Sequence, residues 1–311
     1  MADLTAVLLM AYGTPETPDQ VEPYFTHIRG GRAPSPESVS RLRERYRRVG
    51  GRTPLLDITR QVATALQDDL DRSGCRQKVY VGMKHWHPFI GEVMREMSES
   101  GVTQLTAIAL APHYSRISIG GYRRAIDEAQ RELPAPLSVA LVERWHAEPA
   151  FLDMMATLVR EGLARFPASE RRSVLPVFSA HSLPERIRSW NDPYEQELLE
   201  SSAAVADRVG VTDWRFAWQS AGETGEPWIG PDIVEYLETL HAEGVRSVLQ
   251  VPIGFVSDHL EIYWDIDVEA KEKAAELGMK LERTELPNAR PDFVRVLADV
   301  VRAAASAQPS S

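Results

Sequence analysis

A histidine and a glutamate follow two apolar segments of this 311-residue chain, and together they could hold a divalent metal ion. The first segment, Val174–Phe178, leads into Ser-Ala-His181-Ser-Leu-Pro-Glu, and the second, 248–253, leads into Gly-Phe-Val-Ser-Asp-His-Leu-Glu261. In open α/β sheets, ligands bind at the carboxyl ends of strands. A neutral imidazole beside a carboxylate suits a borderline divalent metal. A lone histidine after a strand is more often structural, so this prediction depends on Glu261 lying beside His181.

Three acids are spaced four residues apart in this region: Glu261, Asp265 and Glu269. On a helix that spacing aligns them along one face. Such a row normally lies in solvent and would pair here with Lys271 or Lys273. However, like charges four apart destabilise a helix that lacks counterions. A row that starts at a metal-binding glutamate could instead pass cations inward or protons outward.

Aromatic residues accompany these candidates. Tyr12 follows the apolar segment 5–11 and precedes a Gly-Thr-Pro turn, so we expect its ring to point into the same site or to pack in the core. The segment 218–231 is rich in Trp, Gly and Pro, and it either walls a flat aromatic ligand or covers a core.

Charge and composition narrow the class of protein. The net charge of −10 argues against nonspecific binding to nucleic acid or anionic lipid. Eight arginines nevertheless lie between Arg29 and Arg52, against two glutamates. Such a basic region suits an anionic small ligand, although most of these arginines are expected on a solvated helix face. No apolar segment approaches the roughly 20 residues that span a bilayer, and the start lacks a signal-type pattern, so we predict a cytoplasmic protein without stable membrane insertion.

Several chemistries are excluded by what the sequence lacks. The single cysteine, Cys75, rules out an internal disulfide and any all-cysteine zinc or iron–sulfur site. The Gly-rich dinucleotide and nucleotide signatures, the Gly-x-Ser-x-Gly elbow and His-Glu-x-x-His are absent.

The elements that must position these residues alternate along the chain. Apolar strands are predicted at 5–11, 78–83, 104–110, 174–178 and 248–253, with helices at 18–28, 36–49, 56–72, 89–100 and 232–241. This alternation predicts an α/β fold with parallel sheets.

The second half of the chain repeats the plan of the first, with a join near 145–149. We therefore predict an N-terminal Rossmann-like domain at 1–147 and a C-terminal one at 148–311, each a parallel sheet flanked by helices. The last helix is expected to pack back on the N-terminal half. The loops 12–15, 113–122, 181–185 and 254–265 would then face one cleft between the halves.

The chain resembles the ferrochelatase family, and within it the soluble bacterial coproporphyrin III ferrochelatases. The resemblance extends from residue 10 to residue 290, and the His-Ser-Leu-Pro and Asp-His-Leu-Glu signatures are highly specific. The matching runs are Met10-Ala-Tyr-Gly-Thr-Pro15, Tyr24-Phe-Thr-His-Ile-Arg29-Gly-Gly-Arg32, Gly82-Met-Lys-His85, Leu110-Ala-Pro-His113, Ser179-Ala-His-Ser-Leu-Pro-Glu185, Trp218-Gln-Ser220, Pro227-Trp-Ile-Gly-Pro-Asp232, Gly254-Phe-Val-Ser-Asp-His-Leu-Glu261 and Leu286-Pro-Asn-Ala-Arg290.

This resemblance implies two Rossmann-like domains around a porphyrin cleft. His181 and Glu261 would lie on one face of the macrocycle as catalytic and metal-binding residues, and Tyr12 on the other as a ligand to the product iron. The substrate contacts it implies are Tyr12, Arg29, Arg45, Thr53 and Tyr122.

The resemblance also implies the reaction: insertion of Fe²⁺, a substrate, into a free-base porphyrin by a monomer without an organic cofactor. Relatives with a 2Fe–2S cluster need four cysteines, so none is expected here. Coproporphyrin III, which would give coproheme in haem biosynthesis, is favoured because Arg29-Gly-Gly-Arg-Ala-Pro-Ser-Pro replaces the apolar lip of membrane-associated relatives. The alternatives are protoporphyrin IX, a cobalt or nickel chelatase of a related tetrapyrrole, and a non-catalytic tetrapyrrole or metal carrier.

Overall fold

The computed structural model describes residues 4–222 and 224–307 and contains two parallel four-stranded sheets. The first has the strand order β2-β1-β3-β4 and the second β6-β5-β7-β8, so the two halves share one topology. The predicted α/β fold of two Rossmann-like halves is confirmed.

The N-terminal half consists of β1 (Leu4–Ala11), α1 (Val21–Ile28), α2 (Pro36–Arg48), α3 (Leu55–Arg72), β2 (Lys78–Met83), α4 (Ile90–Glu99), β3 (Val102–Ala109), α5 (Ile119–Glu132) and β4 (Ser138–Val142). The C-terminal half consists of α6 (Pro149–Ala164), β5 (Leu175–His181), α7 (Tyr194–Val209), β6 (Arg215–Gln219), α8 (Ile233–Ala242), β7 (Ser247–Val251), a π-helix (Ile262–Ala270), α9 (Lys271–Glu276), β8 (Lys280–Arg283) and α10 (Pro291–Ser306). None of the helices in the described ranges is both long enough and apolar enough to cross a membrane.

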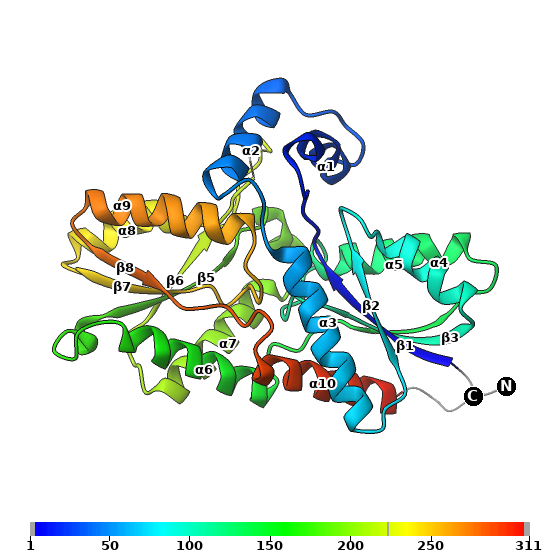
Figure 1. Cartoon of the computed structure of the whole chain (residues 1–311). Coiled ribbons are helices and arrows are strands. Elements are labelled where there is room, and N and C mark those ends of the chain that lie inside the picture. Colours follow the sequence, from blue (N-terminus) through cyan, green and yellow to red (C-terminus); the bar gives the residue numbers. More distant parts are fainter. Residues whose placement is uncertain (1–3, 223, 308–311) are drawn as a thin grey trace.

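Helices cover both faces of each sheet (Figure 1). In the N-terminal half α4 and α5 pack on one face, and α3 packs on the other together with α10 from the far end of the chain. In the C-terminal half α6 and α7 lie on one face, and α8, α9 and the π-helix lie on the other. The helices α1 and α2 stand above the carboxyl end of β1 (Figure 1).

Two strand predictions need correction. The strand expected at 174–178 continues to His181, because Ser179, Ala180 and His181 pair with 217–219 of β6. The edge strands β4, β6 and β8 were not predicted. Each has five residues or fewer, and β4 is half-buried rather than cleanly alternating, so the sequence pattern there is weak.

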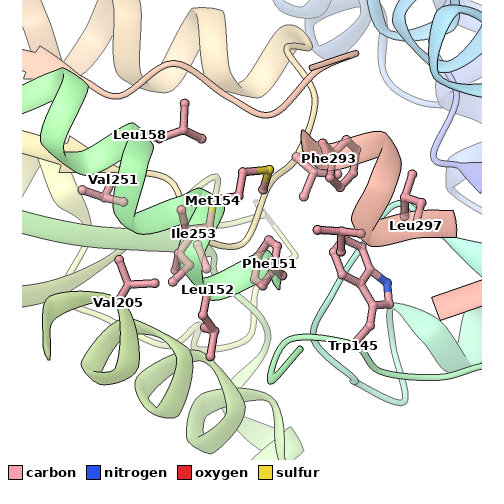
Figure 2. Packing of buried hydrophobic residues seen from close by; sticks show 14 of the residues in the cluster. Trp145, Phe151, Leu152, Met154, Leu158, Val205, Val251, Ile253, Phe293 and Leu297 are labelled. Atoms are coloured by element: carbon pink, nitrogen blue, oxygen red, sulfur yellow. The ribbon is translucent and has the colours of Figure 1, made fainter. Parts of the chain in front are cut away.

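One apolar core joins the two halves. It contains Leu9 of β1, Phe151 of α6, Val251 of β7 and Phe293 of α10, all fully buried. Phe293 and Leu297 lie beside Trp145, which precedes α6 (Figure 2). Because α10 contacts α3, β3 and β4 as well as α6, it packs against both halves at once.

Candidate active site

The candidate residues lie where parallel strands end. Ala11 pairs with Met83 across β1 and β2, which sets Tyr12 beside Lys84 just beyond the sheet. In the second sheet His181 is the last residue of β5, and the loop after β7 leads to Glu261. The carboxyl ends of parallel strands meet at one edge of a sheet, so each half delivers its polar residues to one edge.

His181 and Glu261 form an ion pair. The Nε2 atom of His181 lies 3.5 Å from Oε1 of Glu261. The other ring nitrogen, Nδ1, donates a hydrogen bond to the carbonyl of Ser182. Because Nδ1 is held in this way, Nε2 is the atom that can exchange a proton or bind a metal.

Charge attraction dominates the titration of this pair. Burial lowers the pKa of His181, but the carboxylate of Glu261 outweighs burial and raises the pKa of His181 to about 9. Burial likewise raises the pKa of Glu261, and His181 more than reverses this, so the pKa of Glu261 lies well below its usual range. Without a bound metal, the pair is therefore an imidazolium beside a carboxylate at neutral pH.

His259, which the sequence reasoning did not single out, orients the same carboxylate. Its Nε2 lies 3.4 Å from Oε2 of Glu261, and its Nδ1 lies 2.9 Å from the carbonyl oxygen of Ser257. Each oxygen of Glu261 thus faces one imidazole. The signal was present in the sequence, because His259 stands two residues before Glu261 in Asp-His-Leu-Glu.

The acid row lies on a π-helix, not on an α-helix. In the wider i→i+5 turn, residues four apart still lie nearly above one another. Asp265 is buried at 6% exposure, and burial together with the charges of Glu261 and Glu269 raises its pKa to about 7. Ser220 donates a hydrogen bond to Asp265.

The alternative of a solvent-exposed row paired with lysines does not hold for Asp265. Lys271 pairs with Asp267 at 2.7 Å, and Lys273 pairs with Glu238 at 3.0 Å. Asp265 is instead buried, and Glu269 is half-buried.

Tyr12 lies next to a half-buried lysine. The Lys84 amine is 5.7 Å from the centre of the Tyr12 ring and 5.2 Å from that of Tyr122. Burial, followed by the charge of Arg124, lowers the pKa of Lys84 to about 8. Tyr12 is 42% exposed, so it does not pack in the core, and desolvation followed by the charge of Glu261 raises the pKa of its phenol above the usual range.

The predicted substrate contacts in the basic region lie in different environments. Arg29 is exposed at the end of α1. Arg45 of α2 lies over the ring of Trp264 in the π-helix at 5.3 Å. Thr53 is buried, and its hydroxyl lies 2.8 Å from that of Thr14, so it fixes the turn after Tyr12.

The segment 218–231 places one tryptophan near His181 and another in the core, and its role as a wall for a flat ligand stays a prediction. Trp228 lies near the metal-binding candidate, with its ring 6.1 Å from that of His181. Trp218 is buried and packs against Tyr194 and Phe216 in the core.

Loop 113–122 differs from its prediction. His113 and Ser115 are buried, not open to the site, and they bond to Ser201 and Asp192 of the other half. The reason is that buried polar groups need partners, and α7 supplies them. Tyr122, at the end of this segment, lies near Tyr12, because the Lys84 amine is close to both rings.

No group of three His, Cys, Asp or Glu side chains in ranges 4–222 and 224–307 could hold a metal ion as it stands. His181 and Glu261 would thus supply two ligands and leave other positions open, as catalytic metal sites do. Two surface hollows, of about 260 and 340 Å³, lie along α3 and not at these residues. The porphyrin cleft therefore stays a prediction.

Two parallel α/β halves of one topology form a chelatase-type fold. The sirohydrochlorin chelatase SirB of Bacillus subtilis subspecies spizizenii, solved with cobalt, shares this fold with a TM-score of 0.59 at 11% identity, over 97% of this chain and 96% of that one.

Sequence comparison gives the family. The ferrochelatase family model matches residues 4–305. A ferrochelatase of Herpetosiphon aurantiacus is 50% identical over 97% of this chain and 99% of its own length. The coproporphyrin III ferrochelatase of Bacillus subtilis strain 168 is 40% identical over 95% of this chain and 96% of its own length. The chain belongs to the ferrochelatase family of porphyrin metal chelatases.

Proposed function

We propose that this enzyme inserts Fe²⁺ into coproporphyrin III and thereby makes coproheme in haem biosynthesis. The observation that carries the proposal is the His181–Glu261 pair, an imidazole and a carboxylate 3.5 Å apart at the end of β5. Relatives about 40% identical along nearly the whole chain are named coproporphyrin III ferrochelatases, which supports the choice of porphyrin. With one cysteine the chain has no ligand set for an iron–sulfur cluster, so iron enters as substrate.

Metal delivery begins with the exchange of a proton for a metal ion at His181. Fe²⁺ replaces the proton on Nε2, and the Glu261 carboxylate replaces a water ligand of the ion. The Ser182 carbonyl keeps the ring oriented through Nδ1, so the freed lone pair continues to face the same point. When the ion moves to the macrocycle, Nε2 is free to accept a pyrrole proton as a general base.

The protons must then leave a buried site. Asp265, whose pKa is raised to about 7, can both accept and release a proton near neutral pH. It lies between Glu261 and Glu269 in the row, so we assign these acids to proton removal or to cation entry.

The N-terminal half provides the opposite face. Tyr12, which is 42% exposed, offers an aromatic ring to a macrocycle, and Lys84 beside it offers one cation, whereas Tyr122 is buried at 5% exposure behind the Lys84 amine. The exposed arginines of this half suit the four carboxylates of coproporphyrin III, because guanidinium binds carboxylate through paired donors. Protoporphyrin IX has fewer carboxylates for these arginines to bind.

An anaerobic Fe²⁺ insertion assay with each porphyrin tests the proposal, with loss of free-base fluorescence as the signal. We expect coproporphyrin III to be turned over faster. Faster turnover of protoporphyrin IX would reverse the assignment of the substrate, and an absorbance shift without insertion would indicate a carrier.

The first prediction concerns the pair itself. His181→Ala and Glu261→Gln should keep the fold and bind porphyrin, yet lose insertion activity about 100-fold or more, because proton transfer and metal delivery both fail. The matched control is His87→Ala, which removes an exposed imidazole that pairs with Glu92. Normal turnover by either variant would remove that residue from the site.

A further inference from the structure

A polar junction joins the two halves next to the candidate site. The loop 113–116, which follows β3, lies against the start of α7 from the other half. Glu197 accepts the backbone N–H of Tyr114 at 2.6 Å. Asp192 accepts the N–H of Arg116 at 2.8 Å and the hydroxyl of Ser115 at 3.1 Å. We call this set of three hydrogen bonds the clasp.

The clasp is buried at Glu197 and Ser115 and half-buried at Asp192. Glu197 is 4% exposed and Ser115 is fully buried. Both acceptors are carboxylates, and hydrogen bonds to ionised acceptors are shorter and stronger than neutral ones. Loss of either carboxylate would leave buried donors without partners. His113 adds a neutral bond beside the clasp, 2.8 Å from the hydroxyl of Ser201.

On the C-terminal side the clasp connects directly to the strand end that bears His181. Asp192 also accepts the N–H of Tyr194 at 3.1 Å, which fixes the first residue of α7. The phenol of Tyr194 then donates to the carbonyl of His181 at 3.1 Å. Asp192 therefore contacts the N-terminal loop directly and contacts the backbone of His181 through Tyr194.

On the N-terminal side the same loop leads into α5, where Tyr122 lies. Tyr122 packs under Lys84, whose amine also covers the ring of Tyr12. Gly121 lets this amine approach, because a Cβ at that position would overlap it. The clasp therefore sits midway between the two groups of residues that would face a bound macrocycle.

We propose that Asp192 and Glu197 are positioning residues, which hold the Tyr12 face and the His181 face at the separation required for transfer of the metal. This inference rests on the proposed function. His181 and Glu261 both belong to the C-terminal half, and Glu197 bonds neither of them, so breaking the Glu197 bond of the clasp should leave their capture of Fe²⁺ intact. It misplaces the ion relative to a porphyrin held by the N-terminal half.

The test compares Glu197→Ala with Glu197→Gln, whose amide oxygen can still accept the N–H of Tyr114. We expect Glu197→Ala to lower kcat for insertion about 10- to 100-fold, because small misplacements of reacting groups cost that much. The KM for Fe²⁺ should stay unchanged, and Glu197→Gln should recover most of the rate. Glu195→Ala is the matched control, because Glu195 lies on the same helix but pairs with Arg188 of its own half.

Amide hydrogen exchange at Tyr114 and Arg116 reports on the clasp without any need for activity, and faster exchange at Tyr114 is expected in Glu197→Ala. If Glu197→Ala does not fold, Ser115→Ala takes its place, because it removes one bond of the clasp and no charge. Normal kcat in a variant with exposed amides would overturn the proposal, as would a change confined to the KM for Fe²⁺. If the wild-type protein inserts no metal, the proposed function fails, while the exchange data still judge the clasp.

Discussion

At the scale of single residues, the charge of the site depends on the proton of the His181 imidazole. Burial alone would keep His181 neutral, but the Glu261 carboxylate raises its pKa to about 9. At neutral pH the imidazole is thus charged, so in the proposed reaction a metal ion would have to displace its proton. Glu261 has two opposing effects, since its charge attracts the incoming ion and also stabilises the proton that competes with it.

This competition predicts the pH dependence of metal binding. Below the raised pKa of His181, one proton leaves for each ion bound, so the Kd for Fe²⁺ should fall about tenfold for each rise of one pH unit. This trend should level off near pH 9, where His181 becomes neutral. Anaerobic titrations of the metal-free protein measure it. In Glu261→Gln the levelling should move down toward the ordinary histidine pKa of about 6.5. A Kd that does not change with pH would contradict this account of the pair.

The residues identified from the sequence lie in local motifs, whereas those that were missed depend on tertiary packing. His181 and Glu261 follow apolar strands in distinctive local motifs, so their position at a sheet edge could be predicted. Lys84 could not be singled out in this way. Its environment arises from the pairing of β1 with β2 and from the packing of α5, which bring Tyr12 and Tyr122 to it from different parts of the chain.

At the scale of elements, the π-helix shows a limit of periodicity. Acids spaced four residues apart line one face of an α-helix and nearly line one face of a π-helix. The pattern could therefore predict a row of acids but not the kind of helix. The long central strands were predictable because they are continuous apolar runs, as in β1 and β3. The edge strands β4, β6 and β8 were missed because they are short and partly exposed, so their register depends on the neighbouring strand.

The close packing of Gly254 against β5 sets the geometry of the His181–Glu261 pair. Gly254, at the start of the loop that bears Glu261, packs on β5 so tightly that a Cβ would lie 2.6 Å from Cβ of Ala180. Gly254→Ala must therefore push the loop away from the strand end, and we expect insertion activity to fall about tenfold or more. Rates of insertion and thermal unfolding curves measure the effect. Gly91→Ala is the control, since its Cβ would meet only Ala129 at an ordinary 3.8 Å, and an unaffected rate in Gly254→Ala would show that the loop can shift without consequence.

At the scale of the whole molecule, the two halves share a topology and also a core. A repeat of topology was foreseen from the similar strand ends in the two halves, but a shared core could not be, because it depends on how helices pack between the sheets. Buried side chains of β1, α6, β7 and α10 form one apolar cluster, so no boundary free of contacts separates the halves. The polar clasp and this core together hold the two faces of the site at a fixed spacing.

The continuous core predicts cooperative unfolding. Phe293 of α10 is fully buried, and its ring lies 6.0 Å from that of Trp145. Phe293→Ala should lower the free energy of unfolding by about 3–5 kcal/mol, because it leaves a cavity that the packed surroundings fill only in part. Since α10 packs on both halves, the loss should shift one transition that includes both of them. Denaturant unfolding followed by Trp fluorescence and by circular dichroism measures this, with Leu199→Ala, at a site 45% exposed, as the control. Two separate transitions, of which only one shifts, would mean that the halves unfold independently and that α10 stabilises just one of them.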